Sequence, residues 1–147
     1  MNLNELNLLF QRDLIKLEQE LQSYSDESSL WLVDHQIANS AGNLALHLIG
    51  NLRHFVGLDL GGFPYERNRE REFGAKGEPR EGILQELQEV KNIVETSLLN
   101  FPEDRLSDTS IHAFFGYPMS IGYFLIHLYG HFNYHLGQIN YHRRMLD

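Results

Sequence analysis

Histidines recur every four residues near the end of the chain, at His127, His131 and His135 in HLYGHFNYHLGQ. The surrounding residues predict a helix, whose rise of about 1.5 Å per residue places neighbouring members of the series about 6 Å apart on one face. Buried imidazoles cost free energy unless their ring nitrogens find partners, and a metal ion is one such partner. His127 and His135 lie about 12 Å apart along the axis, so one ion binds only one neighbouring pair.

A third ligand must come from another helix, and His47 is the leading candidate. It lies in SAGNLALHLIGNLRHFVG, which predicts a helix from about Ser40 to Gly57 with His47 facing inward beside Leu44 and Leu48. Helix bundles often build metal sites from single ligands and i, i+4 pairs on facing helices. Three neutral imidazoles suit zinc, nickel or another late divalent ion and leave positions open for water or a substrate.

Amide side chains flank these histidines. Asn43 and Asn51 lie one turn before and after His47, and Gln138 lies close to one turn after His135. An amide at such a position is able to orient an imidazole, a water or a substrate. The alternative interpretation is that these amides only form hydrogen bonds along their own helices.

A structural interpretation of the histidines is equally open, in which the imidazoles fill the core without a metal. A metalloprotease is excluded, because its signature requires Glu directly after the first histidine, whereas Phe132 follows His131. The structural interpretation is favoured for the histidines that lie in a loop or off this helix face, which are His35, His54, His112 and His142.

Arginines and acids alternate in ERNREREF, where the basic residues are Arg67, Arg69 and Arg71. Runs of mixed charge usually lie at the surface and pair locally, and we slightly favour that interpretation. The functional alternative is that one or two of these arginines lie over the mouth of the site and bind a carboxylate, which guanidinium does through two hydrogen bonds.

Apolar residues at steps of three and four predict four helices. The stripes run from Leu3 to about Tyr24, from about Ser40 to Gly57, from Ile83 to Leu98, and from Ser120 through Arg144. Residues 57–79 show no sustained period and predict a long exposed loop, and residues 101–118 are irregular. We therefore expect an all-α chain, an antiparallel four-helix bundle that forms a single domain over residues 1–147.

The composition excludes several classes of function. A formal net charge of −8 repels phosphate backbones and argues against a nucleic-acid binder. The absence of cysteine excludes disulfides, thiolate metal ligands and a cysteine nucleophile, so any thiol in the chemistry comes from a substrate. The N-terminal residues carry scattered charges and predict neither a signal peptide nor a membrane span, so we expect a cytoplasmic protein that does not bind membranes.

Three separated motifs, HLIGNLRHFVG, RNREREF and GHFNYHLGQI, together resemble the DinB-like (YfiT-like) proteins, especially an uncharacterised branch with R-x-R-x-EF and H-x-x-x-H-x-GQI. The similarity spans nearly the whole chain in the family's order. It implies a four-helix bundle with an up-down-down-up arrangement, a homodimer, and a divalent metal held by three histidines. Matched by motif, these ligands are His47, His131 and His135, and His127 falls to second rank.

The resemblance also implies a class of reaction. Family members with assigned activity include thiol-dependent transferases, and others are called metal-dependent hydrolases. We expect an S-transferase in which a divalent metal, zinc or nickel before manganese or iron, activates a low-molecular-weight thiol toward an electrophilic small molecule. The residues expected to contact this thiol cofactor or its substrate are Arg67, Arg69, Arg71, Asn51 and Gln138.

Two alternatives to the transferase stay open. One is a hydrolase that uses metal-activated water, although no carboxylate lies near the three histidines in sequence to act as a general base. The other is a non-catalytic, stress-response metal-binding dimer, in which the metal or the histidines are structural.

Overall fold

The computed structural model describes residues 1–34 and 36–147, and this part of the chain is all-α. His35, for which a structural role is expected, lies outside the described residues. The helical elements are α1 (Leu3–Gln22), η1 (Glu27–Trp31), α2 (Ala41–Leu52), the π-helical η2 (Arg53–Leu58), α3 (Arg69–Gly74), α4 (Arg80–Asn100), η3 (Glu103–Ser107) and α5 (Ile121–Leu146). Among the described residues, extended pairing is limited to one isolated bridge between Thr109 and Ser120.

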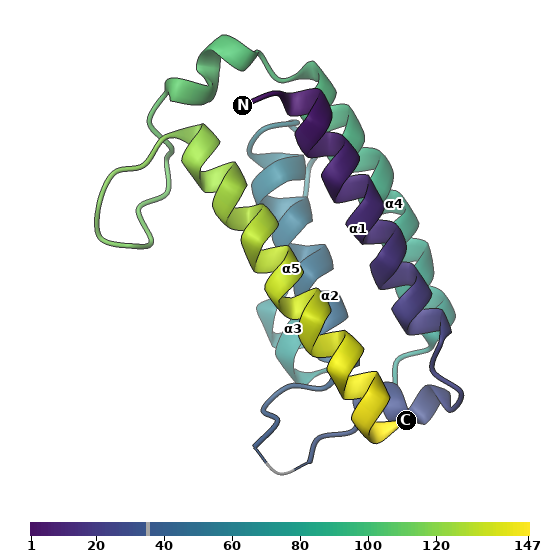
Figure 1. Ribbon diagram of the computed structural model, residues 1–147. Helices are drawn as coiled ribbons and strands as arrows, with labels where there is room; N and C mark the ends of the chain where they lie inside the picture. Colours follow the sequence, from purple (N-terminus) through teal and green to yellow (C-terminus); the bar gives the residue numbers. More distant parts are fainter. Residues whose placement is uncertain (35) are drawn as a thin grey trace.

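The four long helices α1, α2, α4 and α5 form a bundle with the expected up-down-down-up arrangement (Figure 1). The first residue of α4, Arg80, donates to the carbonyl of Tyr24 just after α1, so α4 runs antiparallel to α1. Asp147, which caps the end of α5, accepts from the backbone N–H of Ser25, so α5 runs parallel to α1. The α2 helix packs on α5 and α4 and runs antiparallel to α5.

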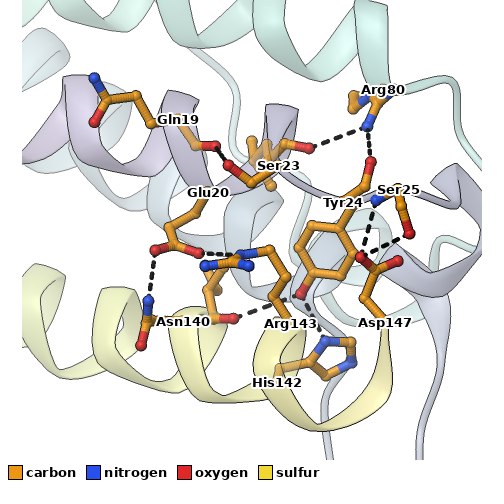
Figure 2. Close-up of polar contacts among 12 residues, drawn as sticks. Gln19, Glu20, Ser23, Tyr24, Ser25, Arg80, Asn140, His142, Arg143 and Asp147 are labelled. Atoms are coloured by element: carbon orange, nitrogen blue, oxygen red, sulfur yellow. Dashed lines mark hydrogen bonds and ion pairs between the residues drawn. The ribbon is translucent and has the colours of Figure 1, made fainter.

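Polar contacts join α1 and α5 at the end of the bundle that carries the C-terminus (Figure 2). The carboxylate of Glu20 accepts from Arg143 Nε at 2.7 Å and from Asn140 Nδ2 at 2.6 Å. The hydroxyl of Tyr24 lies 2.7 Å from Nδ1 of His142, and the other ring nitrogen of this buried histidine lies 2.9 Å from the carbonyl oxygen of Leu32. His142 therefore has the structural role that its sequence context indicates.

The apolar stripes of α1, α4 and α5 form the core of the bundle. In α1 the buried apolar side chains are those of the predicted stripe, namely Leu3, Leu6, Phe10, Leu14, Leu17 and Leu21. Asn2, Ser40 and Ser120 begin the helices α1, α2 and α5 by accepting a hydrogen bond from a backbone N–H of the first turn. None of the described helices is both long and apolar enough to span a membrane.

The α2 helix differs from the amphipathic pattern expected for it, because every one of its residues is buried. Two long helices, α4 and α5, cover part of its surface, and the short α3 covers another part. This all-round burial fits the composition of α2, which contains no Asp, Glu, Lys or Arg. The helix therefore holds its polar residues, including His47, inside the protein.

The prediction of a long exposed loop over residues 57–79 is wrong in part, because residues 59–68 and 75–79 are irregular but the segment between them is helical. Residues 57–79 complete the π-helical turn of η2 and contain α3, whose Glu72 is buried. Asn68 begins α3 by accepting from the N–H of Arg71 at 3.0 Å, and Asn43 of α2 donates to the carbonyls of Glu72 and Ala75. Tertiary contacts to α2 thus hold a helix that is too short to produce a periodic signal.

Asp13 forms a buried polar contact between α1 and α5. Its side chain has no exposed surface and accepts from Arg12 Nε at 2.8 Å and from the hydroxyl of Tyr129 at 2.6 Å. Burial alone would raise the pKa of Asp13, but these hydrogen bonds outweigh burial and hold its pKa well below the ordinary value. The carboxylate therefore stays ionised in the folded protein.

This contact is expected to make the bundle sensitive to acid. A carboxyl whose pKa is lower in the folded than in the unfolded state contributes stability above its unfolded pKa of about 4 and loses that contribution as the pH falls toward its folded pKa. We expect Asp13→Asn to lower the free energy of unfolding by about 1–3 kcal/mol near pH 7 and by less near pH 3, as measured by urea denaturation. An equal loss at both pH values would show that the charge of Asp13 does not matter.

Candidate metal centre

His47, His131 and His135 come together between α2 and α5. Each offers one ring nitrogen as a ligand atom, and these atoms all lie within 4.8 Å of one another. Nε2 of His47 and Nε2 of His131 are 3.1 Å apart, and the rings of His131 and His135 have centroids 4.6 Å apart. The i, i+4 spacing places His131 and His135 on one face of α5, and the packing of α2 against α5 brings His47 next to them.

Two hydrogen bonds fix which ring nitrogen His47 and His135 direct toward the point where the three histidines converge. Nδ1 of His47 lies 2.9 Å from Oε1 of Glu72, and because a carboxylate only accepts, this nitrogen carries the proton. Nδ1 of His135 donates to Oε1 of Gln138 at 2.7 Å. In both rings the lone pair is then on Nε2, the atom left for a metal ion.

The carboxylate of Glu72 is itself held in place. Arg67 donates to it through Nε and Nη2, at 2.9 and 2.8 Å, in a bidentate pair. Gly50 of α2 makes room for it, since a Cβ atom there would lie 2.8 Å from Cδ of Glu72 and still closer to Oε2. The side chain of Asn43 also holds Glu72 in place, by donating a hydrogen bond to the backbone carbonyl of Glu72. The orientation of His47 therefore depends on contacts from α2, α3 and the segment before α3.

The protonation states match those of metal ligands. Burial and the neighbouring imidazole of His135 lower the pKa of His131 to about 4, and burial lowers the pKa of His135. Burial would raise the pKa of Glu72, but hydrogen bonds from His47 and Arg67 outweigh it and lower that pKa. At neutral pH the α5 pair is uncharged and Glu72 is an anion, as binding of a divalent cation requires.

The donor set fits a late divalent metal ion. Three imidazoles form the group, and the two histidines of α5 are only partly buried, so the site has a side open to solvent. Structural zinc sites are usually closed by four protein ligands, whereas three protein ligands with an open side are typical of catalytic sites. The group consists of the same residues that the sequence motifs indicated.

His127 is not part of this group among the described residues. Its ring centroid lies 6.2 Å from that of His131, and the ring contacts Phe115 and Phe124 instead. His127 lies one turn of α5 before His131, which is far enough to keep its ring away from the point where the three histidines meet. This position agrees with its second rank as a candidate ligand.

The three arginines of the middle segment have different surroundings. Arg67 pairs with Glu72, and Arg71 pairs with Glu78 and Glu86 at 2.7 and 2.6 Å. The guanidinium of Arg69 lies over the ring of Phe73, 5.2 Å from its centroid, and that ring in turn contacts His47. Local pairing thus describes Arg67, whereas Arg71 also pairs with Glu86 of α4, and Arg69 has no ion pair in the described part of the chain.

The two amides predicted to contact a cofactor or substrate, Gln138 and Asn51, lie near the site in different ways. Gln138 hydrogen-bonds directly to His135. Asn51 is buried one turn after His47, and its Oδ1 has no hydrogen-bond partner among the described residues. Its predicted contact with a cofactor or substrate stays a prediction.

Sequence reasoning missed Glu72 as a functional residue. It lies 25 positions after His47, within a run of mixed charges that favours a surface interpretation. The signal available was the R-x-R-x-EF motif, which contains Glu72. No carboxylate lies near the three histidines in sequence, and the fold brings Glu72 into contact with His47.

Comparison with known families agrees with this geometry. A search of curated proteins gives no match. The family model described as the DinB superfamily matches residues 15–139, which begin within α1 and end within α5 and include all three histidines. Because this match covers most of the chain, the protein belongs to the DinB superfamily.

Proposed function

We propose that the protein binds one divalent metal ion, zinc or nickel before manganese or iron, through His47, His131 and His135, and transfers a low-molecular-weight thiol to an electrophilic small molecule. The observation that carries this proposal is the convergence of three imidazoles on one point with a side open to solvent. The superfamily assignment supports it, because the DinB-like resemblance implies such chemistry.

Each residue has a defined part in this proposal. A bound metal ion supplies Lewis acidity, which lowers the pKa of a thiol and keeps it as the nucleophilic thiolate. Glu72 and Gln138 hold the Nδ1 protons of His47 and His135 and so keep both Nε2 lone pairs directed at the centre. Arg67 neutralises Glu72 and prevents it from taking up a proton.

Arg69 is the arginine best placed to contact an acidic group of the thiol cofactor. Unlike Arg67 and Arg71, it makes no ion pair in the described part of the chain, and its guanidinium lies over Phe73, which contacts His47. A carboxylate bound there would lie near the metal site without disturbing the pair between Arg67 and Glu72.

The hydrolase alternative receives less support. In zinc metalloproteases a glutamate acts as general base beside the metal-bound water, and here Glu72 is the carboxylate that contacts His47. Both of its oxygens already accept hydrogen bonds, from His47 and from Arg67. A carboxylate engaged in this way is poorly placed to accept a further proton from water.

Cobalt substitution tests the proposal directly, because the chain has no cysteine. Any charge-transfer band between sulfur and cobalt in the near ultraviolet must therefore come from an added thiol. We expect the band when bacillithiol, mycothiol or glutathione is added to the cobalt-loaded protein, and metal-dependent conjugation of the effective thiol to 1-chloro-2,4-dinitrobenzene. In that reaction a carbon–sulfur bond forms, chloride leaves and the thiol proton passes to solvent.

A matched pair of variants separates the proposed site from other histidines. The variant with both His131→Ala and His135→Ala is expected to lose the bound metal, measured by elemental mass spectrometry on untagged protein, and to lose the band. His127→Ala changes the same residue type on the same helix and is expected to keep both. Metal binding without any thiol band would contradict the transferase and leave the hydrolase or the non-catalytic interpretation.

A further inference from the structure

A cavity of about 490 Å³ lies at the end of the bundle opposite the C-terminus. It is enclosed by η2, the last turn of α4, the segment from η3 to α5 and the first turn of α5. Its apolar walls combine the aromatic side chains of Phe55, Phe63, Phe101 and Phe124 with aliphatic side chains of the same segments. A space of this size and lining is typical of a binding site for a small organic molecule.

One histidine is held inside this aromatic lining. The ring of His112 stacks on Phe114 with an interplanar angle of 11°, and its centroid lies 4.9 Å from Phe55 and 5.2 Å from Phe124. Its Nε2 lies 2.7 Å from Oδ2 of Asp59, so Nε2 carries a proton and donates a hydrogen bond to the carboxylate. Packing and hydrogen bonding together fix the orientation of this ring.

The polar atoms of the cavity determine which kind of ligand it would bind. With Nε2 protonated, a neutral His112 has its lone pair on Nδ1, which makes no hydrogen bond in the described part of the chain. The wall also includes Ser97, whose buried hydroxyl has no partner among the described residues. The charged side chains are already paired, Asp59 with His112 and Arg105 with Asp108. An uncharged ligand with a hydroxyl donor is therefore favoured over an anion.

Aromatic side chains separate this cavity from the three histidines of the metal centre. Phe55 lines the cavity, and the guanidinium of Arg67, which binds Glu72, lies 5.7 Å from its ring centroid. On α5, Phe124 lines the cavity and stacks on His127, which precedes His131 by one turn. The cavity is thus a neighbour of the metal centre with its own walls and polar groups.

We propose that this cavity is a second ligand-binding site, which takes a small, uncharged aromatic molecule carrying a hydroxyl group, with His112 accepting the hydroxyl proton in a hydrogen bond. The aromatic walls bury the ring of the ligand, and Asp59 holds His112 in the accepting tautomer. The proposal does not rest on the metal-dependent reaction, because none of the three metal-site histidines lines the cavity.

A pair of fluorinated probes tests the site by ¹⁹F NMR. We expect 4-fluorophenol to bind with a Kd on the order of 1 mM, as suits so small a ligand, and fluorobenzene, which lacks the hydroxyl, to bind about fivefold more weakly. His112→Phe keeps the aromatic packing and removes the acceptor nitrogen. It is expected to abolish the preference for the phenol while fluorobenzene still binds.

A second pair of variants places the probes in the cavity. Asn100→Trp adds a large side chain to the cavity wall and is expected to weaken binding of both probes at least tenfold, whereas Glu95→Trp, an exposed position of α4 outside the lining, leaves it unchanged. Circular dichroism checks that each variant is folded. No binding of 4-fluorophenol to the native protein, equal binding of the two probes, or binding that survives Asn100→Trp would overturn the proposal.

Discussion

The Glu72→Ala variant is expected to lose about 3–5 kcal/mol of free energy of unfolding and to bind zinc about 10- to 100-fold more weakly. The loss of stability follows because Arg67, whose side chain is largely buried, is left without the carboxylate that binds it through two hydrogen bonds. The loss of affinity follows because His47 loses the acceptor that fixes its Nδ1 proton. Urea denaturation and zinc titration measure the two effects separately.

A double variant and a surface variant serve as controls for Glu72. Removing Arg67 as well, in Arg67→Ala with Glu72→Ala, is expected to restore part of the stability because no uncompensated charge remains, while zinc affinity stays low. Glu70→Ala changes an exposed acid on the same short helix and is expected to alter neither quantity. If Glu72→Ala destabilised the protein but bound zinc as the native chain does, Glu72 would have only a structural role.

The long helices and the three-histidine group could be predicted from the sequence because their signals are local. Apolar stripes repeat over several turns in α1, α4 and α5, and the spacing of His131 and His135 fixes their shared face without reference to the rest of the chain. His47 required more, since a helix packed on all sides gives no stripe that points to one neighbour. The inward-facing position of His47 on the predicted second helix makes it the leading candidate, and the family's motifs point to the same residue.

The surroundings of the site could not be predicted because they depend on contacts between distant segments. The α3 helix has six residues and is held by Asn43, 29 positions before the Glu72 carbonyl to which it donates. The same limit applies to His112, whose partner Asp59 lies 53 positions earlier. Neither pair has a local signature, so the sequence favoured surface or structural roles for residues that the fold places in a buried network and in a cavity.

The arginine run illustrates a different limit, in which the sequence allowed both interpretations. Alternating charges often pair within an exposed segment, but Arg71 pairs outside the run, with Glu78 and with Glu86 of α4. Arg67 makes a local pair, but Glu72 is buried against Gly50 and His47, so this pair is part of the candidate metal centre. The charge pattern does not show that Glu72 is buried. Because Glu72 is buried, its ion pair with Arg67 helps to orient His47.

Zinc is expected to raise the melting temperature of the native protein by about 5–10 °C at a concentration 100 times its Kd. A ligand that binds only the folded state at this excess adds about 2.7 kcal/mol to the free energy of unfolding, and in a chain of this size each kcal/mol shifts the melting temperature by roughly 2–4 °C. The variant with both His131→Ala and His135→Ala is expected to show no shift in differential scanning calorimetry, because a single remaining histidine holds zinc weakly. His127→Ala, outside the group, should keep the full shift. An equal shift in all three proteins would place the zinc elsewhere and leave the three histidines as core residues.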